Sequence, residues 1–350
     1  MTPDNPLNTL DTLTLTRLGW QNFFAQQTDT DEMEKTPPVR VTEVHRNGLR
    51  VRGETIDALI PPGPEATVGD WLLFDSELPT ASVVLDRKSL VKRRAAGHDR
   101  SAQLIAANLD TAFIVTSCNQ DFNVARLERY IALTLEAGVA PVLVLTKADL
   151  CDTPETYVDS ARAISDLVPV LTLDARGEEP AQLLAPWCKA GQTVAFLGSS
   201  GVGKSTLTNA LSSTLRIETQ EIREDDAKGR HTTTKRQLHF IPNGCAVLDT
   251  PGMRELQLTE AASGVADLFA DIHALTQQCK FRDCAHETEP GCAIRAALET
   301  GEIDAPRLDR WRKLHTEDQI NTAALAQRNA SDKALAKVIR QAKKLKKQRK

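Results

Sequence analysis

The sequence predicts a multidomain fold in which a small N-terminal β-barrel precedes a central α/β domain and a C-terminal α-helical domain. Short β-prone runs separated by turn signals occupy residues 39–85, and strands alternate with helices across residues 110–250. After residue 261 the sequence is polar and helical, and a cluster of cysteines and a histidine interrupts it. A chain of 350 residues has room for these parts, because one hydrophobic core rarely serves more than about 250 to 300 residues.

We divide the chain into an N-terminal extension and three domains. The predicted boundaries give an extension at 1–37, a barrel at 38–97, an α/β domain at 98–262, and a helical domain with a basic tail at 263–350. The extension has weak hydrophobic periodicity and ends in an acidic stretch followed by a Pro-Pro pair, so we expect one short helix within it.

Five β-prone runs predict the barrel, at 39–44, 49–51, 58–60, 71–74 and 82–85. Turn signals such as Asn47-Gly48 and Pro61-Pro62-Gly63 separate them. Five short strands fit an OB-fold, a barrel that commonly binds oligonucleotides. The basic side chains that would contact RNA are Arg40, Arg46, Arg50, Arg52, Arg87, Lys88, Lys92, Arg93 and Arg94. The pattern equally fits a structural barrel with a solvated basic face, and both interpretations stay open.

The α/β domain is predicted from buried strands at 111–116, 142–145, 170–173 and 193–197. Asn123 suits the start of a helix with a periodic apolar stripe, and Gly138 suits its C-terminal stop. Strands that alternate with helices predict a parallel sheet covered on both faces. Asn243-Gly244, between β-prone runs at 237–241 and 246–248, predicts one antiparallel hairpin, so we expect a mixed sheet.

A phosphate-binding loop follows the last of these buried strands. Residues 198–205 match G-x-x-x-x-G-K-[ST] in full, and a helix is predicted from Lys204 to Leu211. The glycines let backbone N–H groups curl around phosphate oxygens at a helix N-terminus, where Lys204 reaches the β- and γ-phosphates and Ser205 holds Mg²⁺. The predicted nucleotide contacts in this loop are Gly198, Ser199, Ser200, Gly201, Val202, Gly203, Lys204, Ser205 and Thr206.

A second phosphate-site element, Asp249-Thr250-Pro251-Gly252, follows the apolar run at 246–248. Its position at a strand end predicts that Asp249 holds Mg²⁺ and that the Gly252 N–H group contacts the γ-phosphate. The competing interpretation of these four residues is an ordinary turn.

The tetrapeptide Thr146-Lys147-Ala148-Asp149 closes the strand at 142–145, at the sheet edge where nucleotides bind in open α/β folds. A carboxylate accepts hydrogen bonds from N1–H and the 2-amino group of guanine, and adenine offers no such pair. Asp149 therefore predicts GTP and GDP as ligands, with Lys147 lying over the base and Thr146 beside it. Alone, the tetrapeptide fits a helix N-cap equally well, and an ATP-dependent P-loop kinase is an alternative from another class.

Cys279, Cys284, His286 and Cys292 form a metal-binding pattern within the C-terminal domain. Three thiolates and one imidazole fill a tetrahedral Zn²⁺ shell and leave no open position, so we predict one structural zinc ion. The chain has 7 cysteines, an odd number, and their clustering favours a metal site over a disulfide framework. Unrelated buried cysteines are the alternative.

Charge and hydropathy limit the partners of the chain. The formal net charge is -4, yet residues 337–350 carry many Lys and Arg and no acidic residue. We predict that 333–350 forms a basic helix that binds RNA phosphates, with a solvated, frayed end as the alternative. No apolar run approaches the roughly 18 residues that span a bilayer, and the N-terminus lacks a secretory signal, so we expect a cytoplasmic protein without a membrane segment. We also expect a monomer.

These motifs, in this order, resemble the circularly permuted ribosome-assembly GTPases of the RsgA family, also called YjeQ or EngC, in which the guanine motif precedes the phosphate loop. Val68-Gly69-Asp70-Trp71 in the barrel and the segment 229–234 match as well, and the likeness spans residues 39–320. The resemblance implies an OB-fold, a circularly permuted P-loop GTPase domain and a zinc-binding domain. It also implies GTP hydrolysis stimulated by the small (30S) ribosomal subunit during late maturation, with the subunit and its rRNA as partners.

Two positions match the family pattern only in part. The guanine motif of the family usually opens with Asn, and Thr146 offers a hydroxyl where Asn offers an amide. The segment Asp174-Ala175-Arg176 is similar in position to a small loop near the base in the family, which implies a backbone contact at Ala175.

The group that orients the hydrolytic water is not in its usual place. Ras-like enzymes use a Gln directly after Asp-x-x-Gly, where this chain has Met253. We take His231 as the catalytic candidate together with Lys204, and Thr233 as the contact to Mg²⁺ or γ-phosphate. A loop histidine that contacts RNA or solvent is the alternative for His231. Without a resident Gln or arginine finger, we expect hydrolysis to wait for a partner that orders this loop. A nucleotide-gated RNA-binding scaffold with incidental hydrolysis is the second functional alternative.

Overall fold

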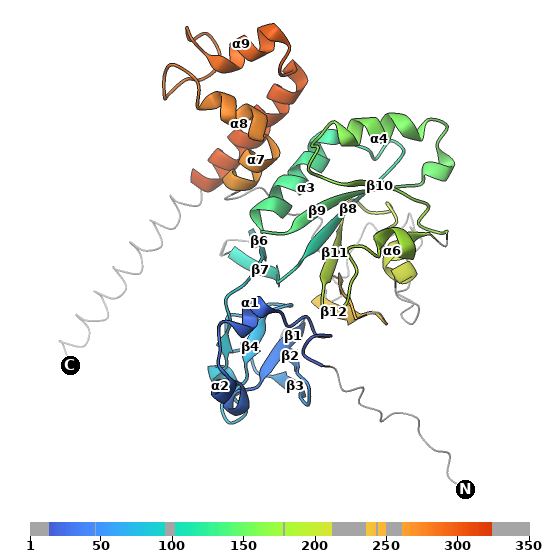
Figure 1. Ribbon diagram of the computed structural model, residues 1–350, viewed down its shortest axis with the longest axis vertical. Helices are drawn as coiled ribbons and strands as arrows, with labels where there is room; N and C mark the ends of the chain where they lie inside the picture. The colour runs from blue at the N-terminus through green and yellow to red at the C-terminus, as the bar shows by residue number, and fades with distance from the viewer. Residues whose placement is uncertain are drawn as a thin grey trace, which may run out of the picture. The chain divides into compact units, whose positions relative to one another are not determined.

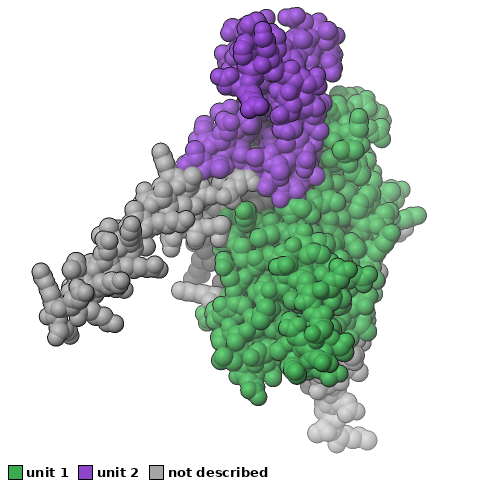
Figure 2. Space-filling view, turned by 60° about the vertical axis from the view of Figure 1, so that its left-hand side comes forward, with its two compact units in different colours: residues 1–130, 137–256 green, residues 131–136, 257–350 purple. Residues whose placement is uncertain are grey.

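The computed structural model describes residues 14–45, 47–94, 102–177, 179–211, 236–242, 244–249 and 261–323 (Figure 1). The chain divides into two compact units, one formed by Met1–Tyr130 and Ala137–Leu256 and the other by Ile131–Glu136 and Gln257–Lys350 (Figure 2). Among the described residues, no helix is long and apolar enough to cross a membrane. The finer boundaries at residues 37, 97 and 262 remain predictions.

The N-terminal part of unit 1 is a small antiparallel barrel preceded by two short helices, α1 (Asn22–Ala25) and α2 (Thr30–Lys35). The strands are β1 (Pro38–His45), β2 (Gly48–Arg52), β3 (Asp57–Ile60), β4 (Trp71–Leu73) and β5 (Val83–Val84). They pair in the order β3, β2, β1, β4, β5, and every pair is antiparallel. The buried residues of the barrel core are Val39, Val41, Leu49, Val51, Ile60, Leu72 and Phe74. The five strands lie where the sequence predicts them.

Apolar side chains hold α1 and the residues before it against the barrel. Leu18 and Phe24 are buried in one cluster with Trp71, Leu73 and Leu85 of the barrel. The rings of Phe24 and Trp71 lie 5.9 Å apart between centroids. A helix of four residues is too short to be stable alone, so the order of α1 comes from this tertiary packing. α2 buries no residue, and its first turn is capped by the Asp29 side chain, which accepts from the Glu32 N–H group.

A two-stranded antiparallel sheet, β6 (Leu90–Arg94) with β7 (Ala102–Ala107), follows the barrel. The sequence pattern does not predict these strands, because Lys92 and Arg93 give the first of them the polarity of an exposed, RNA-contacting segment. Burial of Val91 and Ile105 shows that one face of the pair is nevertheless part of the core.

The α/β part of unit 1 is a mixed sheet with its helices in the connections. Its elements are β8 (Thr111–Ser117), α3 (Val124–Glu136), β9 (Ala140–Thr146), α4 (Pro154–Arg162), β10 (Val170–Thr172), α5 (Pro180–Leu184), β11 (Thr193–Leu197), α6 (Lys204–Leu211), β12 (Arg236–Phe240) and β13 (Ala246–Asp249). The strand order is β10-β9-β8-β11-β13-β12, in which the first five strands are parallel. β12 pairs antiparallel with β13, which confirms the predicted hairpin.

The sheet does not end at β12. This strand also pairs antiparallel with β1 of the barrel, through Glu43 opposite Gln237 and Val44 opposite Arg236. The side chain of Gln237 donates to the Glu43 carboxylate over 3.3 Å. The barrel and the nucleotide-binding sheet therefore share one hydrogen-bonded sheet, a connection that the strand pattern of the sequence does not reveal.

Unit 2 contains the C-terminal part of α3 (Ile131–Glu136), α7 (Ala262–Leu268), α8 (Ala270–Thr276), α9 (Ala293–Thr300) and a helical stretch at 305–323. The carboxylate of Glu136, on the last turn of α3, accepts hydrogen bonds from the N–H groups of Ser263 and Gly264 and from the Ser263 hydroxyl. These are first-turn donors of α7, which has no capping side chain of its own. A Cβ on Gly264 would lie only 2.0 Å from the carbonyl oxygen of Ala132, so this glycine allows α3 and α7 to meet closely.

Candidate nucleotide and metal sites

The phosphate loop connects β11 to α6, as the sequence predicts. Gly198, Gly201 and Gly203 have φ values of 138°, 77° and 100°, in the region that favours glycine. A Cβ on Gly198 would also lie 2.1 Å from the carbonyl oxygen of Val115, so a side chain there would collide with β8. The ammonium group of Lys204 donates to the carbonyl of Gly198 over 2.9 Å and also to that of Ser199. The lysine therefore lies over its own loop.

Three loops meet at the carboxyl ends of the parallel strands β9, β10 and β11. A Cβ placed on Gly203 would lie 3.4 Å from the Ala175 Cβ and 3.7 Å from the Thr146 Cγ2. Thr146 ends β9, Ala175 follows β10, and Gly203 follows β11. This is the edge of an open parallel sheet where nucleotides bind. The structure thus brings the predicted base-side residues next to the predicted phosphate-side residues, although 57 positions separate Thr146 from Gly203 in the numbering.

Within the predicted guanine motif, each residue has a different environment. Thr146 is fully buried, and its hydroxyl lies 2.7 Å from the Val202 carbonyl oxygen. Lys147 has a left-handed backbone with φ of 58°, which turns the chain out of the strand. Asp149 lies in a short turn and is exposed to solvent, as a carboxylate that receives a ligand should be.

Some predicted site residues are described only in part or not at all. Asp249 is the last residue of β13, which runs parallel to β11, so its backbone lies at the edge of the sheet where β11 enters the phosphate loop. His231, Thr233 and Gly252 lie outside the described residues, as does the basic tail at 333–350. The roles predicted for them stay predictions.

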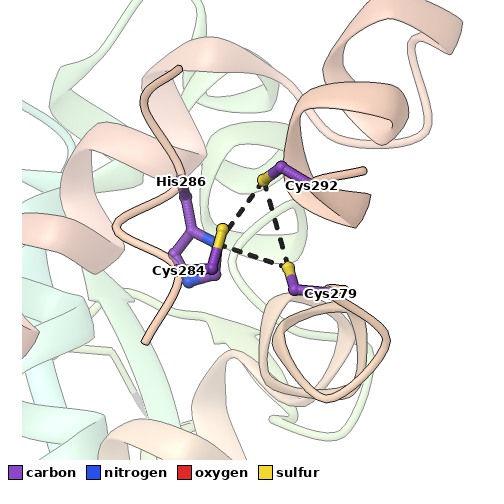
Figure 3. A group of neighbouring side chains, drawn as sticks. All are labelled: Cys279, Cys284, His286 and Cys292. Carbon is purple, nitrogen blue, oxygen red and sulfur yellow. Dashed lines mark hydrogen bonds between the residues drawn. The ribbon is translucent and has the colours of Figure 1, made fainter. Parts of the chain in front are cut away.

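The Cys/His cluster is brought together in unit 2 (Figure 3). Cys279 follows α8, Cys292 immediately precedes α9, and the loop between them carries Cys284 and His286. The ligand atoms of the four residues all lie within 4.8 Å of one another. The sulfurs of Cys279 and Cys292 are 4.0 Å apart and lie 3.5 and 3.6 Å from Nδ1 of His286.

These separations suit a tetrahedral zinc ion. Zn–S bonds of about 2.3 Å at tetrahedral angles place two sulfurs about 3.8 Å apart. Burial alone would raise the pKa of the Cys279 thiol, but the N–H groups of Ala293 and Ile294 in the first turn of α9 lower it. A helix N-terminus therefore favours the thiolate form that binds metal. The donor set and its geometry fit one structural Zn²⁺.

Residues that no sequence pattern marks hold the loop that carries Cys284 and His286. The Glu289 carboxylate accepts hydrogen bonds from the N–H groups of Ala285, Glu287 and Thr288 at 2.9, 2.9 and 3.0 Å. Hydrogen bonds from the backbone lower the pKa of Glu289 to about 2. Arg312 donates to the carbonyl oxygen of His286 over 2.8 Å. No sequence signal marks these residues, because their function depends on the path of the backbone.

The order of the site elements along the chain defines the class of protein. The base-side loop after β9 precedes the phosphate loop after β11, and both lie at one edge of a mixed sheet preceded by a barrel, so this is a circularly permuted P-loop GTPase with an OB-fold. A sequence model described as RsgA GTPase matches residues 84–259. The chain belongs to the RsgA GTPase family.

Similar proteins agree with this assignment over nearly the whole chain. The protein named small ribosomal subunit biogenesis GTPase RsgA 2 of Vibrio parahaemolyticus is 46% identical over 93% of this chain and 92% of its own length. The small ribosomal subunit biogenesis GTPase RsgA of Mesorhizobium japonicum is 49% identical over 88% of this chain and 91% of its own length.

Two solved structures have the same fold. The crystal structure of YjeQ from Thermotoga maritima matches with a TM-score of 0.59 and 26% identity, over 80% of this chain and 97% of that one. The crystal structure of YloQ, described as a circularly permuted GTPase, matches with a TM-score of 0.53 and 24% identity, over 81% of this chain and 95% of that one. An ABC transporter model also matches residues 186–345, a span that begins just before the phosphate loop, which ATP- and GTP-binding proteins share.

Proposed function

We propose that this chain is a GTPase that binds the small (30S) ribosomal subunit and its rRNA and acts in late maturation of that subunit, hydrolysing GTP to GDP and phosphate. The observation that carries the proposal is the meeting of Thr146, Ala175 and Gly203 at one sheet edge, in a chain whose relatives are named for small-subunit biogenesis. We place the protein in the cytoplasm and propose that it acts as a monomer without a membrane partner.

The phosphate loop would hold GTP and GDP through residues 198–206. Its glycine geometry leaves backbone N–H groups free to face phosphate oxygens, and Lys204 supplies the positive charge. Ser205 and Asp249 would hold Mg²⁺, which neutralises charge on the phosphates. Asp149 would select guanine through N1–H and the 2-amino group, and this preference argues against an ATP-dependent kinase.

For hydrolysis we propose that His231 orients the attacking water and that Thr233 contacts Mg²⁺ or the γ-phosphate, with the Gly252 N–H group also at the γ-phosphate. The support is chemical, since Met253 stands where a water-orienting Gln would be, and a thioether has no donor and only a weak acceptor with which to orient water. Turnover should be slow for the free protein and faster when the small subunit is bound. The scaffold alternative predicts normal subunit maturation by a variant that binds GTP but does not hydrolyse it.

The barrel and the zinc-binding unit would supply the rRNA contacts. In the latter, Lys280 and Arg282 lie in the loop between Cys279 and Cys284 and are exposed. One zinc ion held by Cys279, Cys284, His286 and Cys292 would organise this loop, which has little apolar content of its own. We propose that the basic tail at 333–350 adds phosphate contacts, so that deleting residues 331–350 weakens subunit binding most at low salt.

The test is GTP hydrolysis by the full-length chain with and without purified small subunits, with ATP as the control nucleotide. We expect slow hydrolysis of GTP alone, clear stimulation by subunits and no stimulated hydrolysis of ATP. His231→Ala should bind GTP normally and lose most of the stimulated rate. Hydrolysis of ATP at the same rate as GTP would favour the kinase alternative. Tight binding to the small subunit without any increase in the rate of GTP hydrolysis would favour the scaffold alternative.

A further inference from the structure

Arg40, on β1 of the barrel, is a buried arginine that joins four segments of unit 1. Its side chain is only 1% exposed. Four acceptors surround it: the carbonyl oxygens of Leu18 (2.5 Å), Gly69 (3.3 Å) and Asn108 (3.4 Å), and the hydroxyl of Thr193 (2.8 Å). A buried guanidinium is tolerated only when its N–H groups are bonded in this way. Burial lowers the pKa of Arg40 to about 10, so the group remains charged at neutral pH.

Thr193 makes this arginine relevant to the nucleotide site, because it is the first residue of β11. The strand continues to Leu197, and the phosphate loop begins at the next residue. Thr193 is held at its backbone by Asp110, whose carboxylate accepts from the Thr193 N–H and whose own N–H donates to the Thr193 carbonyl. The bond from Arg40 to the Thr193 hydroxyl adds a direct link from the barrel to the start of the strand that carries the phosphate loop.

Residues 14–21, which we call the N-terminal cover, close over the guanidinium. Gly19 has φ of 96°, and a Cβ on it would lie 2.5 Å from Nη1 of Arg40 and 3.1 Å from the carbonyl oxygen of Gly191. Gln21 donates to the same Gly191 carbonyl over 3.5 Å. The cover therefore contacts both Arg40 and the turn that precedes β11. It excludes water from the Arg40–Thr193 bond, which makes that bond stronger than it would be at the surface.

We propose that Arg40 is a positioning residue for nucleotide binding: through Thr193 it fixes the start of β11, so that opening of the barrel loosens the phosphate loop. The strand can transmit this constraint because Val194, Ala195, Phe196 and Leu197 pair with β8, and the first two also with β13. By linkage, a nucleotide bound at the phosphate loop must then disfavour opening of the barrel. This inference rests on the proposed function only in taking GDP as a ligand.

The experiment is amide hydrogen exchange of the full-length chain, read by mass spectrometry with and without GDP. In the unaltered protein, GDP should slow exchange both in peptides that contain the phosphate loop and in barrel peptides that contain β2. One buried hydrogen bond contributes a free energy that corresponds to a roughly fivefold change in an equilibrium. We therefore expect GDP to slow exchange in the barrel by roughly fivefold. Thr193→Val keeps the shape of the side chain and removes the acceptor of the Arg40 bond.

In Thr193→Val, GDP should still protect the phosphate-loop peptides, but the protection of β2 should fall to that without GDP. Thr193→Ser, which keeps the hydroxyl, should behave as the unaltered protein. Thr193→Val leaves the pairing of β1 with β12 intact. If GDP still protects the barrel in this variant, the coupling runs through the shared sheet, and the proposed role of Arg40 is wrong. Absence of barrel protection in the unaltered protein would also overturn it. If GDP protects no peptide at all, the proposed nucleotide site fails instead.

Arg40→Met is the stronger variant, because it removes all four bonds at once. If it folds, it should abolish GDP protection of β2 as Thr193→Val does. If it does not fold, the comparison of Thr193→Val with Thr193→Ser still decides the proposal, since each alters only one side chain at the edge of the cluster.

Discussion

The hydroxyl of Thr146 donates a hydrogen bond to the carbonyl oxygen of Val202 over 2.7 Å and so ties the predicted guanine loop to the phosphate loop. The Thr116 carbonyl oxygen lies 3.2 Å from the same hydroxyl. Both neighbours are acceptors, and a hydroxyl has a single proton to donate. The proton of Thr146 is therefore directed at the protein backbone, and we infer that this residue supports the phosphate loop rather than reading the base.

Thr146→Val should therefore weaken GDP binding without changing the preference for guanine. Loss of one buried hydrogen bond costs about 1 kcal/mol, which corresponds to a roughly fivefold rise in Kd. Thr146→Ser should restore affinity, because it keeps the hydroxyl. Titration of a fluorescent GDP analogue against all three proteins measures this, and equal affinity of the Val variant and the unaltered protein would contradict the inference.

Asp149→Asn should change the base preference. The Asn amide donates where the carboxylate accepts, so it suits xanthine, which has a carbonyl in place of the 2-amino group of guanine. We expect GDP affinity to fall by roughly tenfold to hundredfold, the effect of losing a charge-assisted hydrogen bond, and xanthosine diphosphate to bind better than it does to the unaltered protein. Asp152→Asn, a nearby exposed carboxylate, is the control and should leave both affinities unchanged.

Glu289→Gln should weaken zinc binding although Glu289 is no ligand. The amide retains one oxygen for three backbone donors and points an NH₂ group at the others, so the loop that carries Cys284 and His286 loses its order. We expect zinc affinity to fall by roughly tenfold, as for other residues that orient metal ligands. Competition with a chromophoric chelator measures it.

The matched control for that variant is Glu287→Gln. Glu287 bonds to Glu289 only through its backbone N–H group, so replacing the Glu287 side chain should leave the zinc affinity unchanged. Equal zinc affinity of the two variants would show that the carboxylate of Glu289 is not what holds the loop.

Gly19→Ala should destabilise unit 1. The residue has φ of 96°, and the added Cβ would lie 2.5 Å from Nη1 of Arg40. A strained backbone of this kind costs about 1 to 3 kcal/mol. Gly177→Ala is the control, since its Cβ would meet no atom closer than 3.5 Å and its φ is not positive. Denaturant unfolding followed by tryptophan fluorescence compares the two, and equal midpoints would show that the N-terminal cover is not held as described.

Most of the fold could be predicted because its signals are local. Apolar runs predicted the strands from β8 to β11, and the Asn243-Gly244 turn signal predicted the hairpin of β12 and β13. The phosphate-loop pattern placed α6 at Lys204–Leu211, as observed. The clustering of Cys279, Cys284, His286 and Cys292 could likewise be predicted, because the four residues lie in one short segment. Each of these features depends on residues that are neighbours in the sequence.

Features that depend on distant segments could not be predicted. The sequence predicts that Arg40 is one of the basic side chains that contact RNA. In the structure its side chain is buried and donates to the carbonyl oxygens of Leu18 and Asn108. The cover at 14–21 precedes α1 and forms no helix, so its sequence has only weak periodicity, and its order comes from packing on Trp71 and Arg40. The sequence places Thr146 beside the base only because of its position in the motif. Its hydrogen bond to the Val202 carbonyl oxygen could not be predicted, because the two residues are 56 positions apart.

The pairing of β1 with β12 has a consequence for how the protein can be divided. Without the barrel, β12 would be the edge strand of the nucleotide-binding sheet, with a row of unsatisfied backbone donors and acceptors. Such an edge recruits further strands and promotes aggregation. The barrel thus also acts as a shield against self-association, and a fragment that begins after it would leave that edge exposed however well its nucleotide site is formed.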